Sequence, residues 1–92
     1  MPWGVRLTSA AQRHLFRLTI REAEVVSFNL FRLAEDPVQL SVRPNLREPL
    51  GQEYRFRHAS GAGAIHFTIS FRYDEQSETL QIVRIERELV PR

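Results

Sequence analysis

Three stretches in the C-terminal half of the chain alternate between polar and apolar residues. They are Tyr54–His58, Ala64–Arg72 and Leu80–Glu88. A period of two residues is typical of a β-strand that has one face in water and the other in the core. Short glycine-containing or polar segments separate the stretches, so they predict three consecutive antiparallel strands. Any fold for this chain has to be built around that sheet.

The alternation also predicts which face of the sheet each residue occupies. In the first stretch Arg55 and Arg57 share one face, and Tyr54, Phe56 and His58 share the other. Further along the chain the expected inward residues are Ile65, Phe67, Ile69, Phe71, Val83 and Ile85. The expected outward residues are Ala64, His66, Thr68, Ser70, Arg72, Ile82, Arg84, Glu86 and Glu88. The outward face is therefore expected to carry most of the charge.

The segment before these strands has the signals of one more strand followed by two helices. Weak alternation over residues 3–8 predicts an initial strand. Ser9 stands three residues before Gln12, which is the spacing of a capping box, and predicts a helix over about residues 9–18.

A second capping-box spacing joins Thr19 to Glu22 and predicts a second helix from Ile20 to Glu35. This helix should end before Pro37, because proline disfavours helical geometry in the residue that precedes it. Phe28 falls off the apolar stripe of this helix, and we expect a loop or the first helix to cover it. Residues 37–52 then form a connector rich in proline, with a short extended piece around Leu40–Val42.

The order strand, helix, helix and three strands indicates an α+β fold, because its helices and strands are segregated along the chain. We expect a helical hairpin packed on one face of a four-stranded antiparallel sheet. The chain has 92 residues, which predicts a single domain over residues 1–92.

Composition excludes several classes of protein. The chain has no cysteine, which excludes disulfides and thiolate metal sites, and its three histidines have no metal-ligand spacing. We therefore expect no cofactor. No apolar run is long enough for a membrane helix, and a cytoplasmic protein is expected. All 13 basic residues are arginines, whose guanidinium groups bind phosphate with two parallel hydrogen bonds.

Five segments, taken in order, resemble the RelE/ParE superfamily of small bacterial toxins. They are Trp3–Ala11, Leu33–Pro37, Tyr54–Arg57, Ile65–Ile69 and Leu80–Arg87. The resemblance implies the fold described above and a cognate antitoxin as partner. It leaves the activity open, because activities differ within the superfamily. RelE-like members cut messenger RNA on the ribosome, ParE-like members poison DNA gyrase without cutting nucleic acid, and other members are poorly characterised or inactive.

The resemblance carries over only part of the RelE-like catalytic set. Arg55 and Arg57 match a pair of basic residues on the strand after the connector. Ala64 stands where an arginine is usual, Arg87 is one residue away from the position of a second arginine, and the usual C-terminal tyrosine is missing. Arginine does not release its proton near neutral pH, so neither arginine of the pair is a general base.

His66 could supply the missing proton transfer, because imidazole changes its protonation state near neutral pH. The alternative is a surface histidine without a role. Candidate catalytic residues are Arg55, Arg57, His66 and Arg87. Candidate RNA-binding residues are Arg43, Arg47, Arg72 and Arg84.

The leading hypothesis is a RelE-like toxin, a candidate endoribonuclease that inhibits translation by ribosome-dependent cleavage of mRNA. The hypothesis of a gyrase-binding toxin also remains, because such a toxin needs no general base. A third hypothesis is a degenerate relative that has lost its activity. A basic-faced module that binds nucleic acid is a further alternative, although the outward face lacks aromatic residues on which bases could stack.

Overall fold

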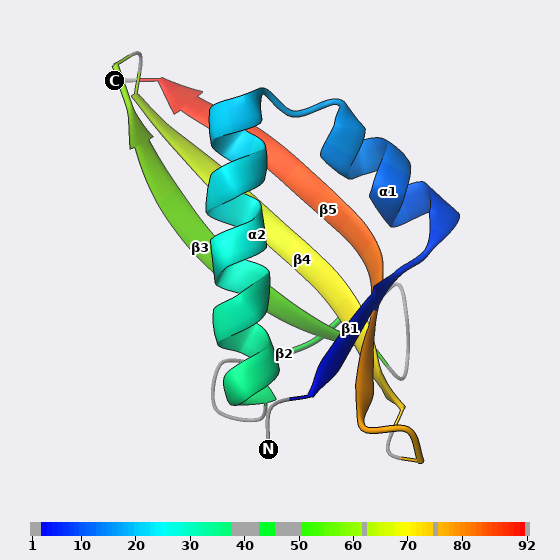
Figure 1. Ribbon diagram of the computed structural model, residues 1–92. Coiled ribbons are helices and arrows are strands. Elements are labelled where there is room, and N and C mark those ends of the chain that lie inside the picture. The colour runs from blue at the N-terminus through cyan, green and yellow to red at the C-terminus, as the bar shows by residue number, and fades with distance from the viewer. Residues whose placement is uncertain (1–2, 38–42, 46–50, 62, 75, 92) are drawn as a thin grey trace.

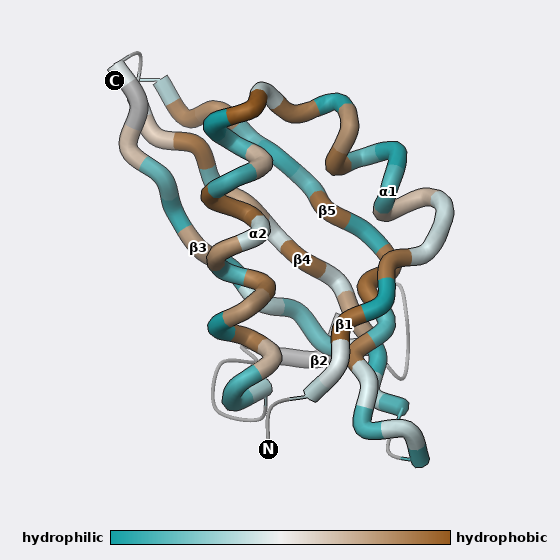
Figure 2. The backbone as a smooth tube through the Cα atoms, in the orientation of Figure 1, coloured by the Kyte–Doolittle hydropathy of each residue, from teal (hydrophilic) through white to brown (hydrophobic). Residues whose placement is uncertain are grey.

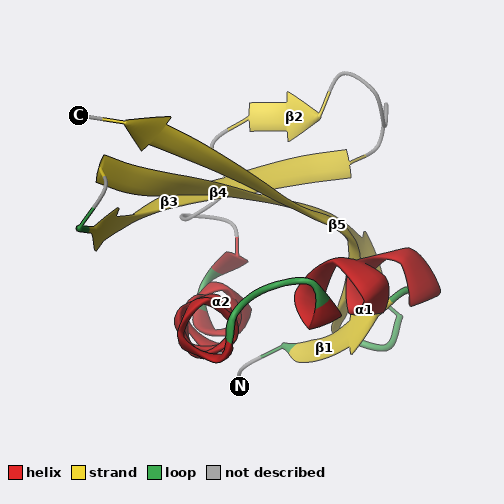
Figure 3. Cartoon of the chain, turned by 90° about the horizontal axis from the view of Figure 1, so that it is seen from above, coloured by secondary structure: helices red, strands yellow, loops and turns green. Residues whose placement is uncertain are grey.

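The computed structural model describes residues 3–37, 43–45, 51–61, 63–74 and 76–91. Its elements are, in chain order, β1 (Gly4–Leu7), α1 (Ser9–Phe16), α2 (Ile20–Glu35), β2 (Arg43–Asn45), β3 (Gly51–Ser60), β4 (Gly63–Asp74) and β5 (Thr79–Pro91). Both helices lie on the same side of the sheet (Figures 1 and 3). The predicted α+β fold, with a helical hairpin on one face of a sheet, is confirmed.

The sheet differs from the predicted four-stranded antiparallel sheet in two respects. It has five strands, in the order β1-β5-β4-β3-β2, and β1 runs parallel to β5. Strands β3, β4 and β5 form the predicted antiparallel meander. The other edge of β5 pairs with β1, which runs in the same direction. The extra strand, β2, pairs with the start of β3. The extended piece expected at residues 40–42 lies outside the described residues.

A threonine caps the N-terminus of each helix. The hydroxyl of Thr8 accepts a hydrogen bond from the Ala11 N–H at 3.2 Å, so Thr8 is the N-cap of α1 and the prediction of Ser9 was wrong by one residue. Thr8 has the extended backbone that an N-cap needs, whereas Ser9 is already helical. At α2 the predicted capping box is present, with Glu22 N–H to Thr19 Oγ1 at 3.1 Å and Thr19 N–H to Glu22 Oε1 at 3.4 Å.

The core lies between α2 and the middle of the sheet. On α2, Val26, Leu30 and Leu33 are buried, at the spacing of one helical face. The four inward residues predicted for β4 are also buried, and Phe67, Ile69 and Phe71 are fully so. Apolar segments recur along α2 and β4 in Figure 2. No helix in the described part of the chain is long and apolar enough to span a membrane.

A β-bulge shifts the register between β4 and β5. Ser70 lies opposite Arg84 and Phe71 lies opposite Ile82, so Val83 has no partner on β4. Ile82 is therefore fully buried, and its predicted outward position was wrong. An extra residue in one strand reverses the alternation beyond it, which a regular period of two cannot anticipate.

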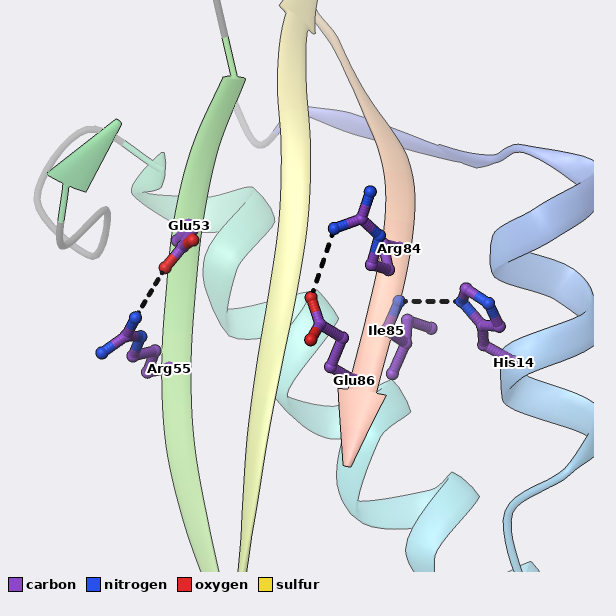
Figure 4. A network of polar contacts seen from close by, with 6 residues as sticks. All are labelled: His14, Glu53, Arg55, Arg84, Ile85 and Glu86. Carbon is purple, nitrogen blue, oxygen red and sulfur yellow. Dashed lines mark hydrogen bonds and ion pairs between the residues drawn. The ribbon is translucent and has the colours of Figure 1, made fainter. Parts of the chain in front are cut away.

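Two side chains of the helical hairpin differ in the structure from what the sequence predicted. His14 on α1, for which no role was predicted, accepts a hydrogen bond at Nδ1 from the Ile85 N–H at 3.2 Å (Figure 4). It therefore satisfies a backbone donor on β5 beyond the end of the pairing with β1. Phe28 on α2 is 63% exposed, so the expectation that another segment covers it was wrong.

Candidate nucleic-acid interface

The face of the sheet that points away from the helices is the candidate site, and we call it the outer face. Its residues on β3, β4 and β5 lie in register as four rows. In the order β3, β4, β5 the rows are Glu53, Ser70 and Arg84; Arg55, Thr68 and Glu86; Arg57, His66 and Glu88; and Ala59, Ala64 and Val90. In Figure 4 the labelled side chains of the first two rows stand in front of the strands, and α2 lies behind them.

The structure brings together most of the basic residues that the sequence suggested. Arg55 and Arg57 are both exposed on β3, and His66 is exposed on β4 directly opposite Arg57. Arg84 lies on the outer face of β5, and Arg72 is exposed further along β4. Residues two apart on a strand are separated by about 6.5–7 Å, so Arg55 and Arg57 can approach one RNA backbone together.

Arg87 does not belong to this group. It lies opposite Phe67, on the face of the sheet that the helices cover. Its Nε and Nη2 donate to Oε1 and Oε2 of Glu22 at 3.1 and 3.2 Å. The alternation that directs Ile85 into the core also directs Arg87 to that side. Arg87 thus holds the start of α2 to β5, away from Arg55, Arg57 and His66.

The remaining candidates are placed less fully. The backbone of Arg43 pairs with Glu53 in the short strand β2. Arg47 lies outside the described residues. Ala64, where the family resemblance called for an arginine, is 9% exposed and lies between Ala59 and Val90 in an apolar row. The row of Ala59, Ala64 and Val90 therefore has no charged side chain.

The outer face also carries acidic residues. Glu53 Oε2 lies 3.0 Å from Arg55 Nη2, and Glu86 Oε1 lies 3.4 Å from Arg84 Nη1 (Figure 4). Both pairs join residues two apart on the same strand. Sequence alternation had placed Glu86 and Glu88 outward but gave neither a role. Each pair has one exposed and one half-buried member. Ion pairs that water still reaches are weak, so a phosphate can compete for the arginines.

Two kinds of chemistry follow from these groups. Guanidinium groups can hold a phosphate, and an imidazole can accept or donate a proton. Among the described residues, no cluster of three or more histidine, aspartate or glutamate side chains could hold a metal ion.

The ion pair between Glu22 and Arg87 allows a prediction about stability that does not involve the outer face. We expect Glu22→Gln to lower the free energy of unfolding by about 1 kcal/mol, because the glutamine loses the charge-assisted hydrogen bonds to Arg87. The effect is small because the Arg87 side chain is partly exposed to water. Urea unfolding of Glu22→Gln, Arg87→Gln and the double variant would show a coupling energy of about the same size. Glu24→Gln, on the exposed side of α2, is the matched control. Equal stability of Glu22→Gln and Glu24→Gln would contradict the prediction.

Comparison with known proteins gives matches among solved structures only. No protein-family model and no curated protein matches the chain significantly. The toxin–antitoxin complex RelBE2 from Mycobacterium tuberculosis contains a chain with a TM-score of 0.77 and 26% sequence identity, covering 96% of this chain and 93% of that one. The intact E. coli RelBE toxin–antitoxin complex gives a TM-score of 0.68 and 11% identity, covering 96% of this chain and 99% of that one.

A third match is the E. coli toxin RelE in its free state, as a variant with two arginines changed to alanine. It has a TM-score of 0.67 and 13% identity, and the match covers 92% of this chain and 82% of that one. The two E. coli proteins share the fold with this chain. The identity to the mycobacterial protein is greater and extends over nearly the whole length. The chain therefore belongs to the RelE/ParE superfamily, as a RelE-like member.

Proposed function

We propose that this chain is the toxin of a type II toxin–antitoxin pair, and that it stops translation in the cytoplasm by cutting messenger RNA on the ribosome. The observation that carries the proposal is the exposed pair Arg55 and Arg57 on the outer face of a RelE-like sheet. Two of the matching structures are toxin–antitoxin complexes, which supports a cognate antitoxin as the partner.

The outer face suits the electrostatic part of RNA cleavage. Attack by a ribose 2′-hydroxyl increases the negative charge on the oxygens around phosphorus, and fixed guanidinium groups stabilise that charge. Arg55 and Arg57 take this role in the proposal. The candidates for binding the rest of the RNA backbone are Arg43, Arg47, Arg72 and Arg84. Binding of this kind weakens with added salt, because it releases counterions from the nucleic acid.

Proton transfer in this proposal falls to His66, which lies opposite Arg57. Arg87 is left out of the proposed catalytic set, because Glu22 holds it on the opposite face of the sheet. Neither the fold nor the rest of the set requires a cofactor.

The helical hairpin presents a second, apolar surface that is separate from the outer face. Four large side chains on it are more than 60% exposed: Phe16, Ile20, Phe28 and Phe31. Exposed apolar surface on a small protein commonly marks a contact with another protein. In the proposed function the antitoxin is the partner available to cover it.

Induced expression in a bacterial host, with pulse labelling of protein and DNA synthesis, tests the proposal. We expect protein synthesis to stop first, with new 5′ ends appearing inside messages. The double variant Arg55→Ala/Arg57→Ala should leave both syntheses unchanged. If DNA synthesis stops first, the nuclease proposal is wrong and gyrase becomes the target to examine. If growth continues, the chain is an inactive relative, consistent with Ala64 and the missing tyrosine.

A further inference from the structure

One row of the outer face places three different functional groups side by side. Arg57 on β3 lies opposite His66 on β4, and His66 lies opposite Glu88 on β5. All three side chains are exposed. Directly opposed residues in an antiparallel sheet have Cβ atoms about 4.5–5.5 Å apart. The imidazole therefore stands between a guanidinium and a carboxylate, within reach of one bound phosphodiester.

This row differs from the other two charged rows of the outer face. Between those two rows Arg55 is paired with Glu53 and Arg84 is paired with Glu86. Within the described residues, Arg57, His66 and Glu88 make no hydrogen bond or ion pair through their side chains. The three groups remain available to a ligand, whereas their neighbours partly neutralise one another.

Among the residues that the structure describes, few other charged groups lie near His66. The next row places Arg55 and Glu86 on the diagonals, and the row on the other side is made of Ala59, Ala64 and Val90. Both helices lie on the opposite side of the sheet (Figure 3). Within the described part of the chain, Arg57 and Glu88 are therefore the charged groups directly opposite the imidazole.

We propose that Glu88 and His66 are the base and the acid of the proposed RNA cleavage, with Arg57 holding the phosphate; this inference rests on the proposed function. Glu88 removes the proton from a ribose 2′-hydroxyl, and the 2′-oxygen forms a bond to phosphorus. The bond from phosphorus to the 5′-oxygen of the next nucleotide breaks, and His66 as imidazolium gives that oxygen a proton. The products are a 2′,3′-cyclic phosphate and a free 5′-hydroxyl. No water, metal or redox partner enters the balance.

This assignment accounts for the two departures of the chain from the RelE-like set. An acid and a base placed on β4 and β5 take over the proton transfers, so the chain needs neither an arginine at Ala64 nor a C-terminal tyrosine. A reaction that uses one general base and one general acid is expected to show a bell-shaped dependence of rate on pH.

The test is single-turnover cleavage of ribosome-bound message by the whole chain carrying Glu88→Gln, His66→Gln or Glu86→Gln. We expect the first two changes to reduce the rate about 100-fold or more, the scale of general acid–base catalysis, while Glu86→Gln retains the rate. Glu86→Gln is the matched control, because it makes the same chemical change on the same strand and face, one row away. Thermal unfolding of each variant checks that the fold is unchanged.

The roles are separated by a message with a sulfur in place of the bridging 5′-oxygen at the cleavage site, because a thiolate leaves without needing a proton. His66→Gln should recover most of its rate on this substrate, and Glu88→Gln should not. The pH–rate profile of Glu88→Gln on the normal substrate should lose its acidic limb, because this variant has no general base.

Three results would overturn the inference while leaving the proposed function in place. They are full cleavage by Glu88→Gln, an equal loss in Glu86→Gln, and no recovery of His66→Gln on the sulfur-containing message. If the unaltered protein does not cut message at all, the proposed function fails and the inference fails with it.

Discussion

Replacing Arg57 with glutamine is expected to slow cleavage of ribosome-bound message by about 100- to 1,000-fold, the range found when a preorganised charge-stabilising donor is removed. Arg57 is exposed on the outer face and, among the described residues, makes no ion pair that would have to be broken before it binds phosphate. Arg55 is held by Glu53 at 3.0 Å, so Arg55→Gln should have a smaller effect. Single-turnover rates over a range of salt concentrations would measure both effects.

Arg32→Gln is the control for Arg57→Gln. Arg32 is an exposed arginine on α2, on the other side of the sheet, so the change in net charge is the same. The slope of log affinity against log salt should become shallower by about 0.7 for each phosphate of a single strand that the variant no longer neutralises. If Arg57→Gln and Arg32→Gln cut message equally fast, the outer face is not where the phosphate reacts.

The second large effect is expected at Gly63, the first residue of β4. Gly63 has a φ of +151°, and a Cβ built there would lie 2.2 Å from the Val90 carbonyl oxygen and 2.9 Å from the Pro91 Cα. Both of these atoms belong to the backbone, which cannot move aside without separating β4 from β5. Gly63→Ala is therefore expected to lower the free energy of unfolding by about 3 kcal/mol or more, the sum of backbone strain and weakened strand pairing.

Gly61→Ala is the matched control, two residues away in the turn after β3. A Cβ at Gly61 would have no atom within 4 Å. Its substitution should change stability by no more than about 0.5 kcal/mol, as is usual for an open surface position. Urea unfolding of the two variants gives the comparison directly. Equal stability would mean that the start of β4 adapts to a side chain, contrary to the close approach of the β5 backbone.

The parts of the site that could be predicted from sequence depend on local geometry. Side chains alternate along a strand, so the outward positions of Arg55, Arg57 and His66 followed from the period of two. The Thr19–Glu22 capping box is also local, because it joins residues three apart. In both cases the residues that determine the structure are neighbours in the chain.

The parts that could not be predicted depend on pairing between distant segments. Alternation does not say which strand lies beside which, so the parallel pairing of β1 with β5 and the row that joins His66 to Glu88 became visible only in the structure. The bulge at Val83 depends on how β4 and β5 fit together, and it reversed the expected position of Ile82.

Arg87 shows two kinds of sequence evidence in conflict. The family resemblance suggested a catalytic role, whereas strand alternation from Ile85 directs Arg87 toward the helices. The structure agrees with the alternation, because Glu22 is buried at the start of α2 and needs a cationic partner on that side of the sheet.

The pairing of β1 with β5 also affects when the protein can become active during its own synthesis. Strand β1 pairs with residues Thr79 to Ile82 of β5, so β1 cannot join the sheet until β5 has been made. Sheets held together by pairing between such distant segments fold slowly compared with helical proteins. Glu88 and its row depend on the same late strand. A nascent chain that still lacks β5 therefore cannot assemble the row of Arg57, His66 and Glu88, and the proposed activity can appear only after β5 has been made.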